Sequence, residues 1–513
     1  MNAEATSGGR GRNVADASAN QIGAQDVFHF TLYLALALWV AHVVTLPVAV
    51  SYDGYIYIDL AEVIGSSRFP HDWQVTRTPL YPLVLKAAFA VAGRKPSTAI
   101  FVSSAFGLGA TLLLTFAARR LLGPLAASIV LVLLSCYPTF VAYQHFVLTE
   151  TGTAFFLAAV LYLLLWTPES TNHTWIKTAS LVAVLSVGYY WRQALLSLAP
   201  VAAVLHGASL YTTWVRERQA ASALRPGFRG KIVHLCVQVS LIGLVPFQLA
   251  RPWSNYVDDA ASVDTTLRQG ILRQALLPPE HPYVGKHQAA YRKAIQESSA
   301  KGSFYSGLRS DLHGPLYNMI FSQRMPLPPR QFFLELVRKY PSRYFAGVCR
   351  TVILFGGAPA LESENRISRQ MILSPDWTGA KFSQGPPHLE KQIQKDLQQQ
   401  TSAGLVLRLL NALIPFYDVF LIYASVVTAI AVVVAFMTRN LTVVTLCAVP
   451  LAFLILPALS LASIDRYAFP TYPALLADAI MAPALLWNRP RQAFSTVFRR
   501  LAGRMQSPAA PKN

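Results

Sequence analysis

The sequence predicts an all-α polytopic membrane protein with about ten transmembrane helices and two large loops on one side of the bilayer. Of its 513 residues, 53% are hydrophobic and 13% are charged, and this charged fraction is about half that of an ordinary soluble domain. The hydrophobic residues also gather in runs that approach the roughly 20 residues a helix needs to cross a bilayer. These runs cover residues 28–50, 99–118, 125–143, 151–166, 179–190, 195–210, 232–250, 413–436, 443–461 and 470–487.

The first run, residues 28–50, differs from a cleavable signal peptide because it is too long and lacks a small-residue cleavage site. The segment before it, 1–27, is rich in small and polar residues, so we expect a disordered cytoplasmic tail. The runs at 151–166 and 179–190 are short for a full crossing. Each would need flanking residues to complete a span.

Basic residues in short loops predict the orientation, since cytoplasmic loops carry an excess of Lys and Arg. Arg119 and Arg120 close the second run, basic residues gather at 216–231 with Glu217 as their only acid, and 488–513 is basic with no acid. We therefore expect these three basic segments and the N-terminus to be cytoplasmic. The net charge of +19 indicates contact with anionic headgroups. Nucleic-acid binding is disfavoured because no basic recognition module is visible.

This orientation divides the chain into segments. We expect a tail at 1–27, a transmembrane module at 28–250 with an outer loop at 51–97, an outer segment at 251–402, transmembrane helices at 403–487 and a basic tail at 488–513. The outer segment is long enough to fold as a small domain. The outer loops contain no glycosylation sequon and the cysteines form no disulfide framework, which favours a bacterial plasma (inner) membrane.

Residues 344–360 are moderately apolar and could be counted as a further span. Counting them would place the acid-free basic tail outside, against the positive-inside rule. Arg350 also interrupts the segment. We therefore expect an interfacial or buried helix on the outer face.

The first outer loop begins with a carboxylate, Asp53, soon after the first run. If the segment is helical, Asp53 and Tyr57 share one face because they are four residues apart. Asp59 and Glu62 then lie on a different face. Asp53 could serve as a helix N-cap, or as a base or metal ligand at the membrane surface.

Three arginines precede helices at the predicted outer rim: Arg77, Arg192 and Arg466. Arg77 adjoins Thr78-Pro79, which would begin a helix with a hydroxyl at the N-cap and proline in the first turn. A helix N-terminus beside an arginine favours anions. Each arginine could instead extend its side chain to the interface. As a set they predict a phosphate-binding rim.

Glu150 lies at the outer end between the third and fourth runs. A carboxylate so close to an apolar segment is costly unless it is paired or functional. Its partner could be an outer-rim arginine, or a divalent metal shared with Asp53, with His145 nearby. No tight cluster of His, Cys and Asp demands a metal. Asp478, inside the last run, also needs a partner and could make a hydrogen bond between helices.

Four short patterns together indicate a family. They are Asp53 after the first run, Arg77-x-Pro79-x-Tyr81-Pro82, Thr149-Glu150 at the end of the third run, and Arg466-Tyr467-x-x-Pro470 before the last. In this order and on this side of the membrane they resemble the C-type membrane glycosyltransferases. The nearest resemblance is to bacterial relatives of protein O-mannosyltransferases and of the lipid A aminoarabinose transferase.

The resemblance implies a C-type fold, a donor sugar on polyprenyl phosphate, and transfer on the outer face to a hydroxyl of a lipid, glycan or protein. It implies catalytic roles for Asp53, which would deprotonate or orient the acceptor, and for Glu150. The residues it places on the donor phosphate are Arg77, Arg192 and Arg466. The residues that would contact substrate are Tyr57, Tyr81, Tyr467 and Trp253. Many relatives carry Asp-Glu where this chain has Asp53-Gly54.

The chemistry suits such a site, because cations stabilise a departing phosphate and a carboxylate can accept the proton of an acceptor hydroxyl. The alternative is a transporter or flippase of lipid-linked or anionic solutes. Transporters often show inverted repeats and polar sites near the bilayer midplane. The runs here are nearly free of charge apart from Asp478 and show no repeat, which disfavours that class.

Overall fold

The computed structural model describes residues 8–220, 228–256, 264–300, 320–355, 404–459 and 469–487, with gaps at 47, 49, 51, 70, 74–76, 169, 265–266, 269, 273–275 and 322–325. The elements within these ranges are helical. Six helices are long and apolar enough to cross a bilayer. They are Gly23–Thr45, Pro96–Leu122, Gln193–Val215, Gly230–Ser254, Gly404–Met437 and Phe469–Trp487.

The first of these spans is the apolar part of α1 (Gly8–Thr45) and the second is α4 (Pro96–Leu122). The others belong to η1 (Gln193–Ser197) with α9 (Leu198–Ala220), to α10 (Phe228–Tyr256), to α19 (Gly404–Met437) and to the last described helix. The predicted runs at 151–166, 179–190 and 443–461 form α7 (Glu150–Leu165), α8 (Thr171–Trp191) and α20 (Leu441–Leu459).

The predicted run at 125–143 is two helices, α5 (Pro124–Ser135) and α6 (Pro138–Gln144), bent by 62°. Pro138 causes the break, because proline lacks an N–H and its ring disfavours helical geometry in the residue before it. Tyr137 accordingly has an extended ψ of 107°. Within the described residues, length and composition thus support six spans, or seven if this bent pair counts as one, and the expected count of about ten is not confirmed.

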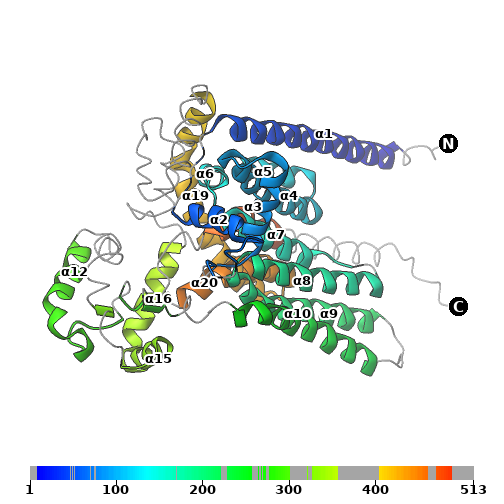
Figure 1. Ribbon diagram of the computed structural model, residues 1–513. Helices are drawn as coiled ribbons and strands as arrows, with labels where there is room; N and C mark the ends of the chain where they lie inside the picture. The colour runs from blue at the N-terminus through cyan, green and yellow to red at the C-terminus, as the bar shows by residue number, and fades with distance from the viewer. Residues whose placement is uncertain are drawn as a thin grey trace, which may run out of the picture.

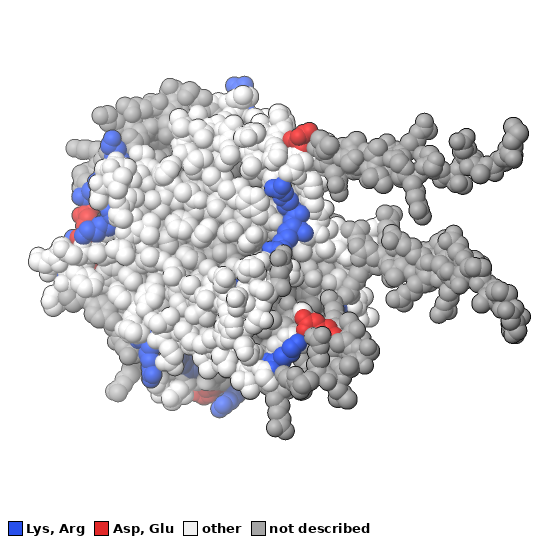
Figure 2. Space-filling model, turned by 90° about the vertical axis from the view of Figure 1, so that its right-hand side faces the viewer, with Lys and Arg blue, Asp and Glu red and all other residues white. Residues whose placement is uncertain are grey.

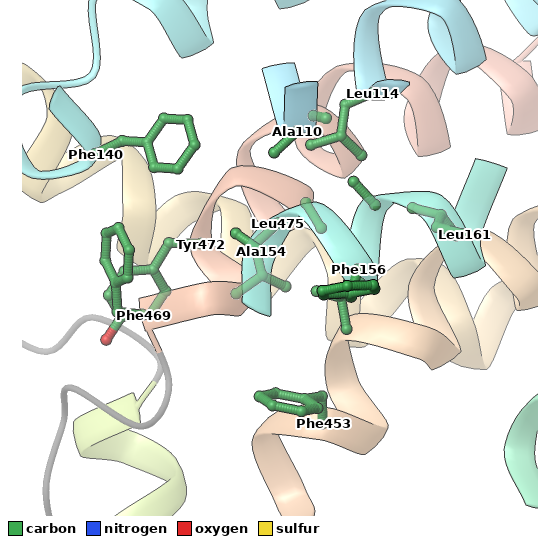
Figure 3. Close-up of a cluster of buried hydrophobic side chains, with 14 of the residues drawn as sticks. Ala110, Leu114, Phe140, Ala154, Phe156, Leu161, Phe453, Phe469, Tyr472 and Leu475 are labelled. Carbon is green, nitrogen blue, oxygen red and sulfur yellow. The ribbon is translucent and has the colours of Figure 1, made fainter. Parts of the chain in front are cut away.

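α7 lies among the other membrane helices and packs against α4, α8 and α20 (Figure 1). Its side chains are buried almost throughout. Figure 3 shows side chains through which these helices meet: Ala154 and Phe156 of α7, Ala110 and Leu114 of α4, Phe453 of α20 and Leu475 of the last helix. The first residue of α7 is therefore held firmly by the bundle.

Residues 51–97, the predicted first outer loop, contain α2 (Tyr52–Val63) and α3 (Leu80–Ala92), which pack on each other. On the outer face of α2, Asp59 pairs with Arg68, and Glu62 pairs with Arg94. The predicted separation of these two acids from Asp53 is confirmed, because Asp53 has a different partner, described below.

The second outer segment contains α12 (Gln288–Ala300), α15 (Pro329–Lys339) and α16 (Pro341–Phe355). Its buried side chains, among them Leu272, Tyr291 and Phe332, form a cluster separate from that of the membrane helices. In Figure 1 these helices lie on the left. The N-terminal end of α1 and one end of each of α8, α9 and α10 lie on the right. They therefore occupy one end of the bundle.

Charged side chains are sparse on the flank of the molecule. Figure 2 shows a broad face that is almost free of them, with Lys and Arg at its margins. Large apolar side chains of the membrane helices are exposed instead, among them Phe30, Tyr33 and Val433. Such a surface matches lipid tails between two polar margins, as the sequence predicts.

Candidate functional site

The first predicted site pair lies between α2 and the segment before α3. Arg77 Nη2 is 2.5 Å from Asp53 Oδ1, and its Nη1 donates to the Tyr57 hydroxyl at 3.3 Å. The guanidinium also lies over the Tyr57 ring, 5.2 Å from its centroid. The predicted shared face of Asp53 and Tyr57 is confirmed. Asp53 is already inside the first turn of α2, so it is not the N-cap that was the alternative.

The second pair lies between α7 and the end of α8. Glu150, the first residue of α7, is only 2% exposed, and its Oε1 is 3.5 Å from Arg192 Nη1. Arg192 has an extended backbone between α8 and η1. The expectation that an outer-rim arginine pairs with Glu150 is confirmed. A nearly buried carboxylate requires such a partner.

Hydrogen bonds from neighbouring residues connect the two pairs. Thr78, next to Arg77, donates its hydroxyl to the Trp191 carbonyl at 2.8 Å. Trp191, next to Arg192, donates its indole Nε1 to the Thr149 carbonyl, also at 2.8 Å. Thr149 directly precedes Glu150. The two ion pairs are thus parts of one structure, built from four segments of the chain.

The predicted N-cap role of Thr78 is wrong. The N-cap of α3 is Pro79, with no side-chain capping bond, and the helix begins at Leu80. The Thr78 hydroxyl bonds across to α8 instead, where the carbonyl of Trp191 has no helical partner within reach.

Two glycines allow the segments to approach. A Cβ on Gly152 would lie 2.0 Å from the Trp191 ring, and a Cβ on Gly54 would lie 2.9 Å from the Val147 carbonyl oxygen. Gly152 therefore leaves room for the indole that joins the pairs. Gly54 stands where the resemblance implies a second acid, and the close backbone of the segment before Glu150 leaves no room for that side chain.

Aromatic rings pack beneath and beside the pairs. Tyr81 is fully buried, and its ring lies between those of Tyr57 and Trp191, at 5.0 Å and 4.9 Å. The Trp73 indole donates to the Arg77 carbonyl at 3.1 Å, and Trp253 of α10 meets the Trp73 ring edge-on. Tyr81 is thus in the packed floor of the site, and Trp253 reaches it through Trp73.

Sequence reasoning missed Trp73, Trp191 and the bridging role of Thr78. The available signal was proximity, since each lies within four residues of a predicted arginine. Arg466 and Tyr467 lie outside the described residues. The residues that follow them, Phe469–Thr471, form η4.

Among the residues that the structure describes, no group of three or more His, Cys, Asp or Glu could hold a metal ion. Asp53 and Glu150, the two residues that could share a metal, each contact an arginine. His145 contacts His42, with 3.1 Å between Nδ1 of His42 and Nε2 of His145. Asp478 is fully buried, and neither carboxyl oxygen has a hydrogen-bond partner among the described residues, so the interhelical bond that it could make is not seen there.

No protein-family model matches the chain, and no curated protein matches it. Among solved structures it is similar to ArnT from Cupriavidus metallidurans bound to undecaprenyl phosphate, with 15% identity over 89% of this chain and 78% of that one, and a TM-score of 0.33. It is also similar to the Archaeoglobus fulgidus oligosaccharyltransferase tethered to an acceptor peptide, with 13% identity over 90% of this chain and a TM-score of 0.43. The match covers 50% of the oligosaccharyltransferase.

Proposed function

We propose that the protein is a membrane glycosyltransferase that moves a sugar from a polyprenyl-phosphate donor to a hydroxyl of a lipid, glycan or protein acceptor. The observation that carries the proposal is the pair of carboxylate–arginine contacts, joined through Thr78 and Trp191 at one end of a membrane bundle. A lipid-anchored donor has its phosphate at the bilayer boundary, where helices such as α7 begin. The arginines supply the charge that such a phosphate requires.

The two carboxylates have different roles in this proposal. Asp53 is partly accessible, with 17% of its side chain exposed, so it can reach an acceptor hydroxyl and act as general base. Glu150 is almost inaccessible and acts by holding Arg192 in place. Asp53 is then the catalytic residue, and Glu150 is a positioning residue.

In the reaction, the bond between the anomeric carbon and the phosphate oxygen breaks, and its electron pair stays on the phosphate. Arg77 and Arg192 stabilise the charge that develops there, together with Arg466 on the evidence of its sequence pattern. The acceptor oxygen forms the new bond to the anomeric carbon, and its proton passes to Asp53. Before the acceptor binds, the contact with Arg77 fixes the position of the Asp53 carboxylate.

The basic residues support an extracytoplasmic site. Arg119 and Arg120 end α4, at the end of the bundle away from Asp53 and Glu150, and the positive-inside rule places that end in the cytoplasm. The site would then be extracytoplasmic. A periplasmic reporter fused after Gln398 should be active, and one fused after Gln219 should not.

Mass spectrometry of lipid-linked sugars and envelope glycans tests the activity. Wild type, a deletion strain and the deletion strain complemented with Asp53→Asn are compared. Loss of one sugar from a glycan, with accumulation of its polyprenyl-phosphate donor in both mutant strains, supports the proposal and identifies both substrates. Unchanged glycans and donors, with the protein expressed, would contradict it.

Asp478 favours a second candidate, a transporter or flippase of lipid-linked or anionic solutes. An ionisable residue buried in a membrane helix often marks a solute or proton pathway. The ion pairs, however, lie at the end of the bundle, whereas transporters bind near the midplane. An accumulation of donor on the cytoplasmic side alone would favour this candidate.

A further inference from the structure

α16 presents an apolar stripe that no described part of the protein covers. Phe345 and Ile353 are 68% and 63% exposed, and Cys349 between them is also exposed. The three residues are spaced by four, so they align along one face of the helix. An aligned apolar stripe of this kind marks a contact surface.

The side of α16 next to the stripe is fixed to the membrane helices. Val348 and Val352 pack against their core, and Thr351 is fully buried. The hydroxyl of Tyr344 donates to the carbonyl of Leu459 at 3.0 Å, at the last residue of α20. α16 is therefore held at the level where a membrane helix ends, and the stripe cannot rotate inward.

The length of α16 matches a helix that lies on a membrane. Its 15 residues extend about 22 Å, which is less than the roughly 30 Å of hydrocarbon that a spanning helix crosses. It is absent from the helices that could span a bilayer. Arg350, which interrupts the apolar sequence of α16, also disfavours a membrane-spanning helix.

Basic residues flank the stripe. Arg343 and Arg350 are seven residues apart, two turns, and so lie on one side of the helix. Arg338 and Lys339 end α15 directly before it. α16 itself contains no acidic residue. An apolar face with basic residues at its edge is typical of helices that lie in an anionic membrane surface.

We propose that α16 lies flat in the headgroup region of the adjacent leaflet, with Phe345, Cys349 and Ile353 among the acyl chains. Arg343 and Arg350 contact the phosphates of anionic phospholipid. This contact between α16 and the membrane holds the second outer segment against the bilayer, at the end of the bundle that carries the two ion pairs. The inference is independent of the catalytic proposal.

The exposed thiol of Cys349 allows a direct test in the full-length protein. In a Cys136→Ser, Cys236→Ser, Cys447→Ser background, Cys349 is labelled with a nitroxide and the protein is placed in lipid nanodiscs. Accessibility to oxygen and to a water-soluble nickel chelate is then compared by electron paramagnetic resonance. We expect oxygen to relax the label more than the chelate does.

The matched control is Leu334→Cys in the same background with Cys349→Ser. Leu334 lies on α15, is 52% exposed and lines a surface groove with Glu335, Arg338 and Lys339. Its label should be more accessible to the chelate. A chelate-accessible label at position 349 would overturn the proposal, and so would spin–spin broadening there, which would indicate a second copy of the chain on this face.

The lipid charge is tested separately. Adding phosphatidylglycerol to phosphatidylcholine nanodiscs should move the label at position 349 deeper. The shift should be lost in Arg343→Gln/Arg350→Gln and kept in Arg343→Lys/Arg350→Lys, each arginine contributing about fivefold to surface affinity. An equal depth in both lipids for the parent protein would refute the anionic-lipid contact.

Discussion

The first outer loop contains two kinds of arginine–carboxylate pair, and their surroundings differ. Arg68 contacts Asp59 and Asp72 with all three side chains about half exposed, at 46%, 52% and 49%. Arg77 contacts Asp53, and their side chains are only 24% and 17% exposed. Exposed pairs contribute little because water screens them, whereas partly buried pairs carry a desolvation cost. The Arg77–Asp53 pair therefore carries a desolvation cost that the exposed pairs of Arg68 do not.

The hydrogen bonds that Arg68 makes with the Asp72 and Asp59 carboxylates raise the pKa of its guanidinium. They connect α2 to the turn that follows it. Among the contacts of the described residues, none joins these exposed pairs to α7 or α8. The buried pairs, in contrast, are joined to both helices through Thr78 and Trp191.

The largest expected effect is that of Asp53→Asn. Loss of the general base should lower the transfer rate by about 100-fold or more, while the amide keeps the size of the side chain and the protein remains in the membrane. Asp59→Asn, on the same helix, is the matched control and should keep full activity. Normal transfer by purified Asp53→Asn would remove this residue from the mechanism.

Glu150→Gln should affect both stability and activity. It leaves Arg192 partly buried without its carboxylate, and breaking such a pair costs about 3–5 kcal/mol. Thermal unfolding in detergent measures the loss. The double variant Glu150→Gln/Arg192→Gln should recover much of the stability but none of the donor binding. Recovery of activity in the double variant would show that Arg192 does not contact the phosphate.

Gly152→Ala tests the connection between the pairs. The added methyl group would overlap the Trp191 ring, and such overpacking costs about 1–3 kcal/mol. Displacing Trp191 should also reduce donor affinity, measured as a higher KM. Gly23→Ala is the control, because a Cβ there meets nothing within 4 Å. Equal stability and KM in both variants would show that the connection has no importance.

The smallest effect is expected for Arg68→Gln. Its pairs are exposed, so unfolding temperature and transfer rate should equal those of wild type within measurement error. Arg77→Gln, measured in parallel, should lose donor turnover. A large loss of stability or transfer rate in Arg68→Gln would show that the exposed and partly buried pairs do not differ in importance.

Much of the fold could be read from hydrophobic runs and from single residues. Each predicted run has a helix, and α16 appears where an interfacial or buried helix was expected. The count of about ten spans is not confirmed by the described residues. The run at 125–143 contains Pro138, whose effect on helix geometry could have predicted the bend, and α7 is too short to qualify by length.

The sequence by itself determined the helices, the shared face of Asp53 and Tyr57, and the requirement that Glu150 have a partner, because these follow from local periodicity and from the cost of burying charge. Only the tertiary structure decided which arginine pairs with which acid, and that Thr78 and Trp191 join the pairs. The Thr78–Trp191 bond spans 113 positions and the Trp191–Thr149 bond spans 42. Such contacts depend on how helices pack, and packing at Gly54 and Gly152 is set by shape, which no local pattern encodes.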